Sequence, residues 1–264
     1  MPRSLWNGVI SFGMVSIPVG LSTVVQEKDL SFNQIHTVCG SRIKLQKYCP
    51  VCERVVENTE LAKGYQYAKN QYVLLDDEDF EAVPVPTKHT ISVLAFVKAE
   101  QIDPVYFDSS YYLEAGEAGK KPFALLAKAL EEKQVSALGK IALRNKENLC
   151  VIRLANGELM LETLFWPDEI RKHEGQKVDD VKVDEKELKM ALSLIELLED
   201  DFHPENFKDE YREALLERIE AKAQGQELHE APATPETKVI DLMEALKASV
   251  EAAKKNRPAK EKSG

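Results

Sequence analysis

One histidine and three of the four cysteines in this chain lie within a segment of 17 residues, at spacings that suit a metal ion. His36 precedes Cys39 by three positions, and Cys49 precedes Cys52 by the same interval. Two ligand pairs, each separated by two residues, are typical of the turns that hold a tetrahedral structural zinc. The four side chains would fill every coordination position, so the pattern predicts a structural zinc rather than a catalytic one.

Two other interpretations of these residues remain open. His36 and Cys39 could be ordinary half-buried residues, which would leave Cys49 and Cys52 as an isolated pair. A thioredoxin-like redox role for that pair is less favoured, because no βαβ pattern surrounds it. Cys150 lies in an apolar strand pattern and is interpreted as a small core residue.

Basic residues gather in two places and could contact phosphate. Between the two ligand pairs lie Arg42, Lys44 and Lys47. Further on, Ile141 and Leu143 alternate with polar or small positions, which predicts a strand with one apolar face and one cationic face. The alternative is an ordinary half-exposed sheet with solvated lysines. The candidate phosphate-binding residues are Arg42, Lys44, Lys47, Lys140, Arg144 and Lys146.

The elements around the second basic group are well marked. Phe123, Leu126 and Leu130 recur at helical spacing after Pro122, which suits a first helical position. Strands are expected at 139–146, 149–154 and 159–165, with a hairpin turn at Asn156-Gly157.

Further strands are expected on the N-terminal side of that helix. Residues 6–25 are rich in β-formers interrupted by glycine and proline, which predicts one long strand bent as at a barrel corner. A strand pair is expected over 65–75, and single strands over 90–97 and 105–113.

Two motifs that resemble catalytic or nucleotide sites are better explained otherwise. The four consecutive acids at 76–79 could suggest a two-metal nuclease, but they fit the capped start of a short helix over 78–83. Residues 116–121 resemble a phosphate loop, but only two residues separate the glycines where four are needed. No nucleotide cofactor is expected.

The C-terminal third reads as helical. A capped start at Asp184 leads into an apolar face, and a second helix repeats apolar residues every fourth position from Phe207. Residues 226–237 have the composition of a linker. A short amphipathic helix beyond it has nothing local to pack on, which favours a partner or partial disorder. Its candidate partner-binding residues are Val239, Met243, Leu246 and Val250, and a basic cluster follows them.

Composition excludes some classes of protein. The chain has 264 residues, 44% of them hydrophobic, as in a globular protein. It has no apolar run long enough for a membrane span and no pattern of a signal peptide, so a cytoplasmic protein with reduced thiols is expected. The net charge of −10 argues against a surface that is basic overall. A local basic stripe within an acidic protein can still bind nucleic acid.

Several segments resemble the prokaryotic Ku family of non-homologous end joining. These are Leu5–Gly8 with Ile10–Gly13, Gly139–Arg144, Gly157–Leu164, Asp168–Arg171 and Phe202–Tyr211. The resemblance implies a SPOC-like β-barrel that begins in the N-terminal segment, and a homodimeric ring around double-stranded DNA ends. It also implies recruitment of the ATP-dependent DNA ligase D, a nucleoid-associated location and no catalytic activity of its own. Relatives with and without cysteines at these positions make zinc compatible with the family without requiring it.

The expected fold is therefore α+β, with a β-barrel core over residues 1–175 that carries the DNA-binding face. A helical arm for dimer or core packing is expected over 176–225, a linker over 226–237, and an amphipathic helix with a mobile basic tail over 238–264. Two rival functions remain. One is a zinc-dependent nucleic-acid hydrolase, which the closed ligand set disfavours. The other is a protein-interaction scaffold that does not bind DNA, which the acidic charge suggests.

Overall fold

The computed structural model describes residues 4–84, 87–144, 146–173, 175, 181–225 and 242–256. The chain divides into two compact units, Met1–Lys172 and His173–Gly264, which are described separately. The expected linker over 226–237, Val239 and the basic residues after 256 lie outside the described residues. None of the helices in the described ranges combines the length and the apolarity needed to cross a membrane.

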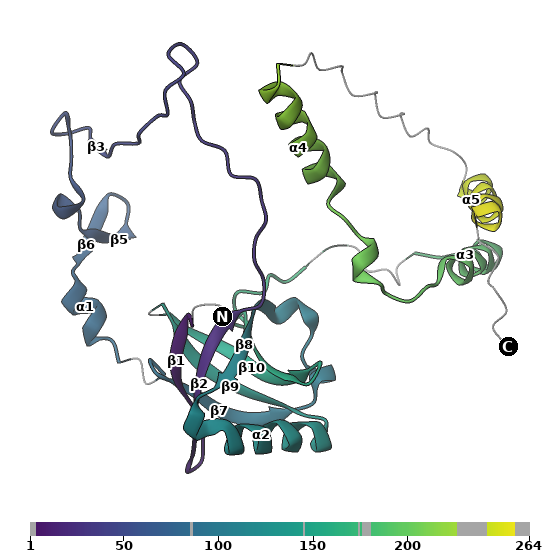
Figure 1. Ribbon diagram of the computed structural model, residues 1–264, viewed down its shortest axis with the longest axis horizontal. Coiled ribbons are helices and arrows are strands. Elements are labelled where there is room, and N and C mark those ends of the chain that lie inside the picture. Colours follow the sequence, from purple (N-terminus) through teal and green to yellow (C-terminus); the bar gives the residue numbers. More distant parts are fainter. Residues whose placement is uncertain are drawn as a thin grey trace. The chain divides into compact units, whose positions relative to one another are not determined.

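A closed barrel of seven strands forms the centre of the first unit (Figure 1). Around the barrel the strands follow the order β1-β2-β8-β11-β10-β9-β7, and β1 closes it by pairing in parallel with β7. The barrel strands are β1 (Trp6–Phe12), β2 (Val15–Thr23), β7 (Thr90–Val97), β8 (Phe107–Ala115), β9 (Ser136–Leu143), β10 (Lys146–Ala155) and β11 (Glu158–Leu164). The α+β class with a barrel core is thus confirmed.

The barrel interior is filled by branched aliphatic side chains at alternate strand positions. Ile10, Ile141 and Ile152 are fully buried there. Helix α2 (Lys120–Lys133) lies across one end of the barrel (Figure 1), and its Leu126 and Leu130 join the same core cluster. The helix and the hairpin at 156–157 occur where the periodicity placed them, because local pattern and burial agree at these positions.

The N-terminal segment differs from the expected single bent strand. It forms a hairpin of β1 and β2, in which Phe12 pairs with Val15. Gly13 has φ of +59°, a conformation that glycine adopts without strain, and it allows a two-residue turn. The prediction of one continuous strand was therefore wrong, because glycine was interpreted as a bend rather than a reversal.

Between β2 and β7 the chain makes an excursion, here defined as residues 24–86. Its elements are β3 (Tyr48–Cys49), β4 (Arg54–Val55), β5 (Lys63–Ala68), β6 (Gln71–Leu75) and α1 (Asp77–Ala82). The strands form two separate two-stranded sheets, and none of the excursion's described residues is buried. Asp76 accepts a hydrogen bond from the Asp79 amide at 3.0 Å, so the acidic run does start a helix.

The second unit contains α3 (Glu185–Leu198), α4 (Glu210–Ala223) and α5 (Leu242–Asn256). Helix α5 packs against α3. Its residues Met243, Leu246 and Val250 are half-buried, and so are Met190 and Leu194 of α3. The expectation that the last helix has nothing local to pack on was wrong, because the apolar positions of α3 extend beyond one face and offer it a partner.

Candidate nucleic-acid interface

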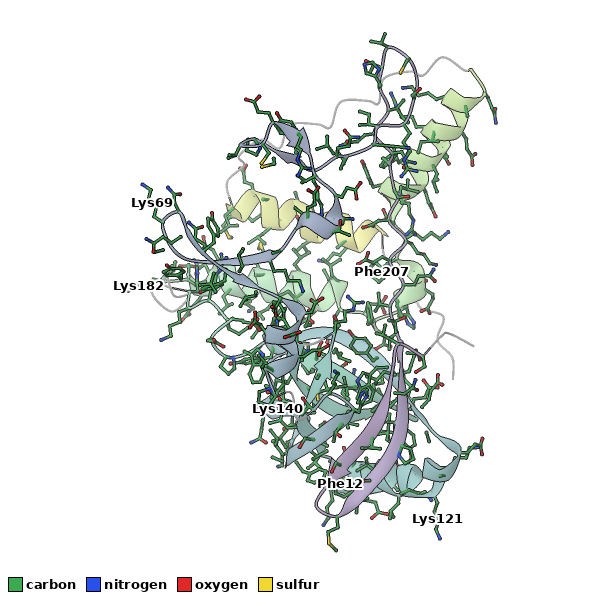
Figure 2. The ribbon with its side chains drawn as sticks, turned by 90° about the vertical axis from the view of Figure 1, so that its left-hand side faces the viewer. Phe12, Lys69, Lys121, Lys140, Lys182 and Phe207 are labelled. Atoms are coloured by element: carbon green, nitrogen blue, oxygen red, sulfur yellow. The ribbon has the colours of Figure 1, made fainter. Side chains whose placement is uncertain are left out.

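The prediction of one cationic strand over 139–146 was wrong, because β9 ends at Leu143 and Lys146 begins β10. Of the three predicted cations β9 carries only Lys140, and this lysine is already paired. Lys140 Nζ lies 3.0 Å from Glu147 Oε2 on the neighbouring strand. The same ammonium lies 5.3 Å from the centroid of the Trp166 ring, within reach of a cation–π contact. Both members of the ion pair remain about one-third exposed. Lys140, labelled on the barrel in Figure 2, therefore has a neutralising partner on its own surface.

Glu147 also anchors the end of the excursion. Its Oε1 accepts a hydrogen bond from Thr87 Oγ1 at 3.2 Å. Thr87 is buried, and its carbonyl accepts from the Ala142 amide at 3.2 Å. The Lys140–Glu147 pair therefore lies where the chain returns to the barrel, which gives it a structural role independent of any ligand.

The next two candidates differ from each other. Lys146 Nζ lies 3.4 Å from Glu169 Oε1, so this lysine is also paired. The pKa of the Glu169 carboxyl is lowered, first by the hydrogen bond from the Trp166 amide and then by the Lys146 charge. Arg144 is exposed in the β9–β10 turn with φ of +52°. No carboxylate in the described part of the chain forms an ion pair with it.

The excursion carries cations that form no ion pair with a carboxylate among the described residues. Arg42, Lys44 and Lys47 are all exposed, and residues 30–52 include no aspartate or glutamate. Lys47 Nζ donates a hydrogen bond to Asn58 Oδ1 at 2.9 Å. Among the described residues no carboxylate pairs with Arg42 or Lys44. A local charge of +3 thus stands within a chain whose net charge is −10.

The predicted metal ligands come together in pairs. His36 Nδ1 lies 3.0 Å from Cys39 Sγ. Hydrogen bonds from Ser41 and then from His36 lower the pKa of the Cys39 thiol to about 7. The pKa of Cys49 is lowered by hydrogen bonds, first from the Cys52 amide and then from the Val51 amide. Amides directed at a cysteine sulfur would also stabilise it as a thiolate ligand.

The two pairs do not form one cluster. Within the described ranges, which contain all four side chains, no three His, Cys, Asp or Glu residues are grouped closely enough to hold a metal ion. Each pair therefore fits half of a tetrahedral zinc site, and a zinc bound by all four stays a prediction. Cys150 is buried as expected, and burial raises the pKa of its thiol to about 12.

Glu147 and Trp166 were missed by the sequence reasoning. Both take part in fixing Lys140, and Glu147 faces it only because the hairpin pairs Leu143 with Lys146. A sequence interpretation that ended the first strand at Leu143 and began the next at Lys146 would have indicated this contact. Of the predicted partner-binding residues, Met243, Leu246 and Val250 lie together on α5, at the surface that contacts α3.

Comparison with known proteins places this architecture in a family. The model of the Ku70/Ku80 beta-barrel domain matches residues 11–190. The chain therefore belongs to the Ku family, whose barrel domain includes β9, β10 and the excursion.

Individual relatives carry a common name. The chain is 42% identical to "Non-homologous end joining protein Ku" of Heliobacterium modesticaldum, over 96% of this chain and 92% of that protein. It is 39% identical to the protein of the same name from Solibacter usitatus, over 97% and 96%. The Symbiobacterium thermophilum protein of that name is 45% identical over 97% of this chain. The chain covers 65% of the length of that relative, and the same share of the Frankia casuarinae protein.

Proposed function

We propose that this protein is a homodimeric ring that binds double-stranded DNA ends in non-homologous end joining. The observation that carries the proposal is the excursion, which leaves the barrel, buries none of its described residues, and bears a carboxylate-free basic stretch over residues 30–52. Membership of the Ku family and the names of the relatives support the same role.

A second copy of the chain is the partner that the excursion needs. The β5–β6 hairpin exposes Tyr65, Tyr67, Tyr72 and Leu74, and Tyr65 and Tyr72 belong to opposite faces because their cross-strand partners alternate. Figure 2 shows Lys69 at its tip. An isolated two-stranded hairpin is marginal in water, so apolar side chains on both faces favour burial against another surface. In a C2 dimer the same surface is used twice.

Binding to DNA would depend on phosphate and not on base sequence. Arg42 and Lys44 carry charges that no carboxylate among the described residues neutralises, and contacts with phosphate position a duplex without reading its bases. The acidic remainder of the chain would repel DNA and so favour binding through the excursion. We therefore rank Arg42, Lys44, Lys47 and Arg144 above Lys140 and Lys146 as phosphate ligands. The location expected from this role is the nucleoid.

We further propose that the role is non-catalytic and consists of recruiting the ATP-dependent DNA ligase D. The region 238–253 remains the proposed docking segment. Because Met243, Leu246 and Val250 lie toward α3, ligase binding through these residues would have to displace α5. Removing residues 226–264 should then weaken ligase stimulation and leave DNA binding by the excursion largely intact.

A structural zinc, one per chain, is also proposed. The amide hydrogen bonds to Cys49 and the close approach of His36 to Cys39 support it, since both prepare a ligand pair. Metal analysis of protein purified without chelator should give one zinc per chain, and its absence at stoichiometric level would exclude the site.

The decisive experiment for the ring compares a small covalently closed DNA circle with the same DNA after linearisation. A closed protein ring can load only over an end, so the linear form should bind and the circle should not. Salt-dependent retention on duplex DNA, measured alongside, separates DNA binding from a scaffold that never contacts DNA. Equal affinity for both forms would refute threading, and no affinity for either would refute DNA binding.

A further inference from the structure

The two candidate ligand pairs have the same local structure. In the first pair, the His36 amide donates to the Ser41 carbonyl at 2.9 Å and the chain reverses after Cys39. In the second, Cys49 pairs with Arg54 across the short β3–β4 sheet. The residue after the second ligand is left-handed in both cases, with φ of +69° at Gly40 and +50° at Glu53. Each pair is therefore a completed turn that presents two ligands.

The stretch between the two turns keeps them apart. Residues 43–47 contain no turn, and every residue from 41 to 48 is exposed. Within the described ranges, which contain all four ligands, no three His, Cys, Asp or Glu side chains are grouped closely enough to hold a metal ion. Zinc binds sulfur at about 2.3 Å and nitrogen at about 2.0 Å. One copy in this conformation therefore does not bring both pairs to one metal ion.

We propose that each zinc site is formed between two copies of the chain, with His36 and Cys39 from one copy and Cys49 and Cys52 from the other. The inference rests on the homodimer proposed above and specifies the contact that closes it. Three thiols release their protons to solvent as the metal binds. The dimer then holds two equivalent zinc ions, each shared by both subunits.

The spacing of the ligands fits this arrangement. When the connecting stretches of two copies run antiparallel about a dyad at Lys44, the turn that follows in one copy lies beside the turn that precedes in the other. Lys44 is midway between the pairs, so this arrangement brings His36 and Cys39 to the same end as Cys49 and Cys52 of the partner subunit. Both ligand pairs are therefore matched by a single two-fold axis, as an isologous contact requires.

This register also has a consequence for DNA. The two Lys44 side chains meet near the axis, where like charges oppose each other. Backbone phosphates bound by each of them would offset that repulsion and place DNA beside the zinc sites.

Exposed apolar side chains lie where the partner would cover them. Val38 and Val51, within the two turns, are 86% and 89% exposed, and Leu45 of the connecting stretch is 89% exposed. A hollow of about 660 Å³ adjoins this stretch, lined by Leu45, Lys47, Val55, Val56 and Asn58 among others. In the antiparallel arrangement about Lys44, the partner subunit's Leu45 would lie opposite Ile43.

The test asks whether two variants of the full-length chain, each lacking one ligand pair, can together form a zinc site. One variant carries His36→Ala with Cys39→Ala, and the other carries Cys49→Ala with Cys52→Ala. Each is expressed alone, and the two are also co-expressed with different tags so that the heterodimer can be isolated by tandem purification. Zinc is measured by mass spectrometry, and cobalt is substituted to read the thiolate-to-metal absorption band.

Shared sites predict zero zinc in either variant alone and one zinc per heterodimer, because one complete ligand set is restored. The wild type should hold two zinc ions per dimer. A heterodimer without zinc, beside a wild type that holds one per chain, would overturn the proposal in favour of sites within one chain. Half a zinc per chain retained by the His36/Cys39 variant would overturn it in favour of four cysteines gathered from two copies.

Two controls keep these outcomes interpretable. All four ligands lie outside the barrel, so the far-ultraviolet circular dichroism and the main thermal transition of each variant should match the wild type. Light scattering of the wild type tests the homodimer separately. A dimer that binds linear DNA but fails complementation would refute only the shared zinc, whereas a monomeric wild type would refute the proposed ring itself.

Discussion

Replacing Lys44 and Lys140 by glutamine, one at a time, should separate free cations from neutralised ones. Lys44 is exposed and has no carboxylate partner among the described residues, whereas Lys140 lies 3.0 Å from Glu147. A phosphate that binds Lys140 must displace that carboxylate, and the gain in charge pairing is then largely cancelled. We therefore expect Lys44→Gln to weaken DNA binding and Lys140→Gln to change it little.

The expected magnitude follows from counterion release. Each phosphate contact changes log K by about 0.9 per tenfold change in salt. A homodimer carrying Lys44→Gln loses two contacts, which reduces the magnitude of the salt slope by about 1.8. If variant and wild type bind equally when extrapolated to 1 M salt, the variant should bind about 60-fold more weakly than the wild type at 0.1 M salt. With Arg42, Lys44, Lys47 and Arg144 engaged in both copies, the wild-type slope would be about −7.

The assay is fluorescence anisotropy of a short linear duplex titrated at several potassium chloride concentrations. Lys121→Gln serves as the matched control, because Lys121 is exposed on α2 and belongs to neither candidate group. A Lys140→Gln slope reduced as much as that of Lys44→Gln would refute the reasoning from ion pairs. The Lys140–Glu147 pair, whose members are about one-third exposed, should itself contribute less than about 1 kcal/mol to stability, so both variants should remain folded in the assay.

Three other predictions concern the fold and the thiols. Gly139→Ala should destabilise the barrel by about 1–3 kcal/mol in urea unfolding, because its Cβ would lie 2.6 Å from the Ser92 carbonyl oxygen; unchanged stability would contradict the packing. Leu246→Asp should release α5 from α3 and increase its proteolysis, while the main thermal transition stays within a degree or so; equal proteolysis would contradict the contact. In chelator-treated protein, Cys39 should be alkylated with a rate that rises through pH about 7, since its thiolate forms above its lowered pKa, while Cys150 should react only after unfolding; early labelling of Cys150 would contradict its burial.

The barrel was largely predictable, because its signals are local and agree with one another. The switch from helical to alternating periodicity after residue 133 and the Asn156-Gly157 turn both depend on neighbours in sequence. The closed strand order was implied only by the family resemblance, because the parallel pairing of Val9 with Thr90 joins residues far apart in the chain. The N-terminal hairpin was missed because a glycine in a β-rich run permits a reversal as readily as a bend.

The candidate site was predictable in composition and less so in geometry. Sequence identifies lysines, but whether Lys140 is neutralised depends on Glu147 across a hairpin and on Trp166 beyond the next strand. The four metal ligands show the same limit. Their spacing predicted a zinc site, whereas their assignment to one chain or to two depends on whether residues 43–47 fold back or stay extended.

Charge distribution explains how a protein with a net charge of −10 can be directed to DNA. The helices of the second unit begin with acids at Asp184 and Asp209 and add more along their lengths, so that unit would repel a duplex at low salt. The stretch 30–52 has cations and no carboxylates, so it would attract a duplex. In the proposed dimer this stretch is present twice about one axis, and its local charge doubles without any change elsewhere. Affinity for DNA therefore depends on assembly of the dimer. A single copy offers half the phosphate contacts, and because log K depends linearly on the number of contacts, its binding constant is far less than half that of the dimer.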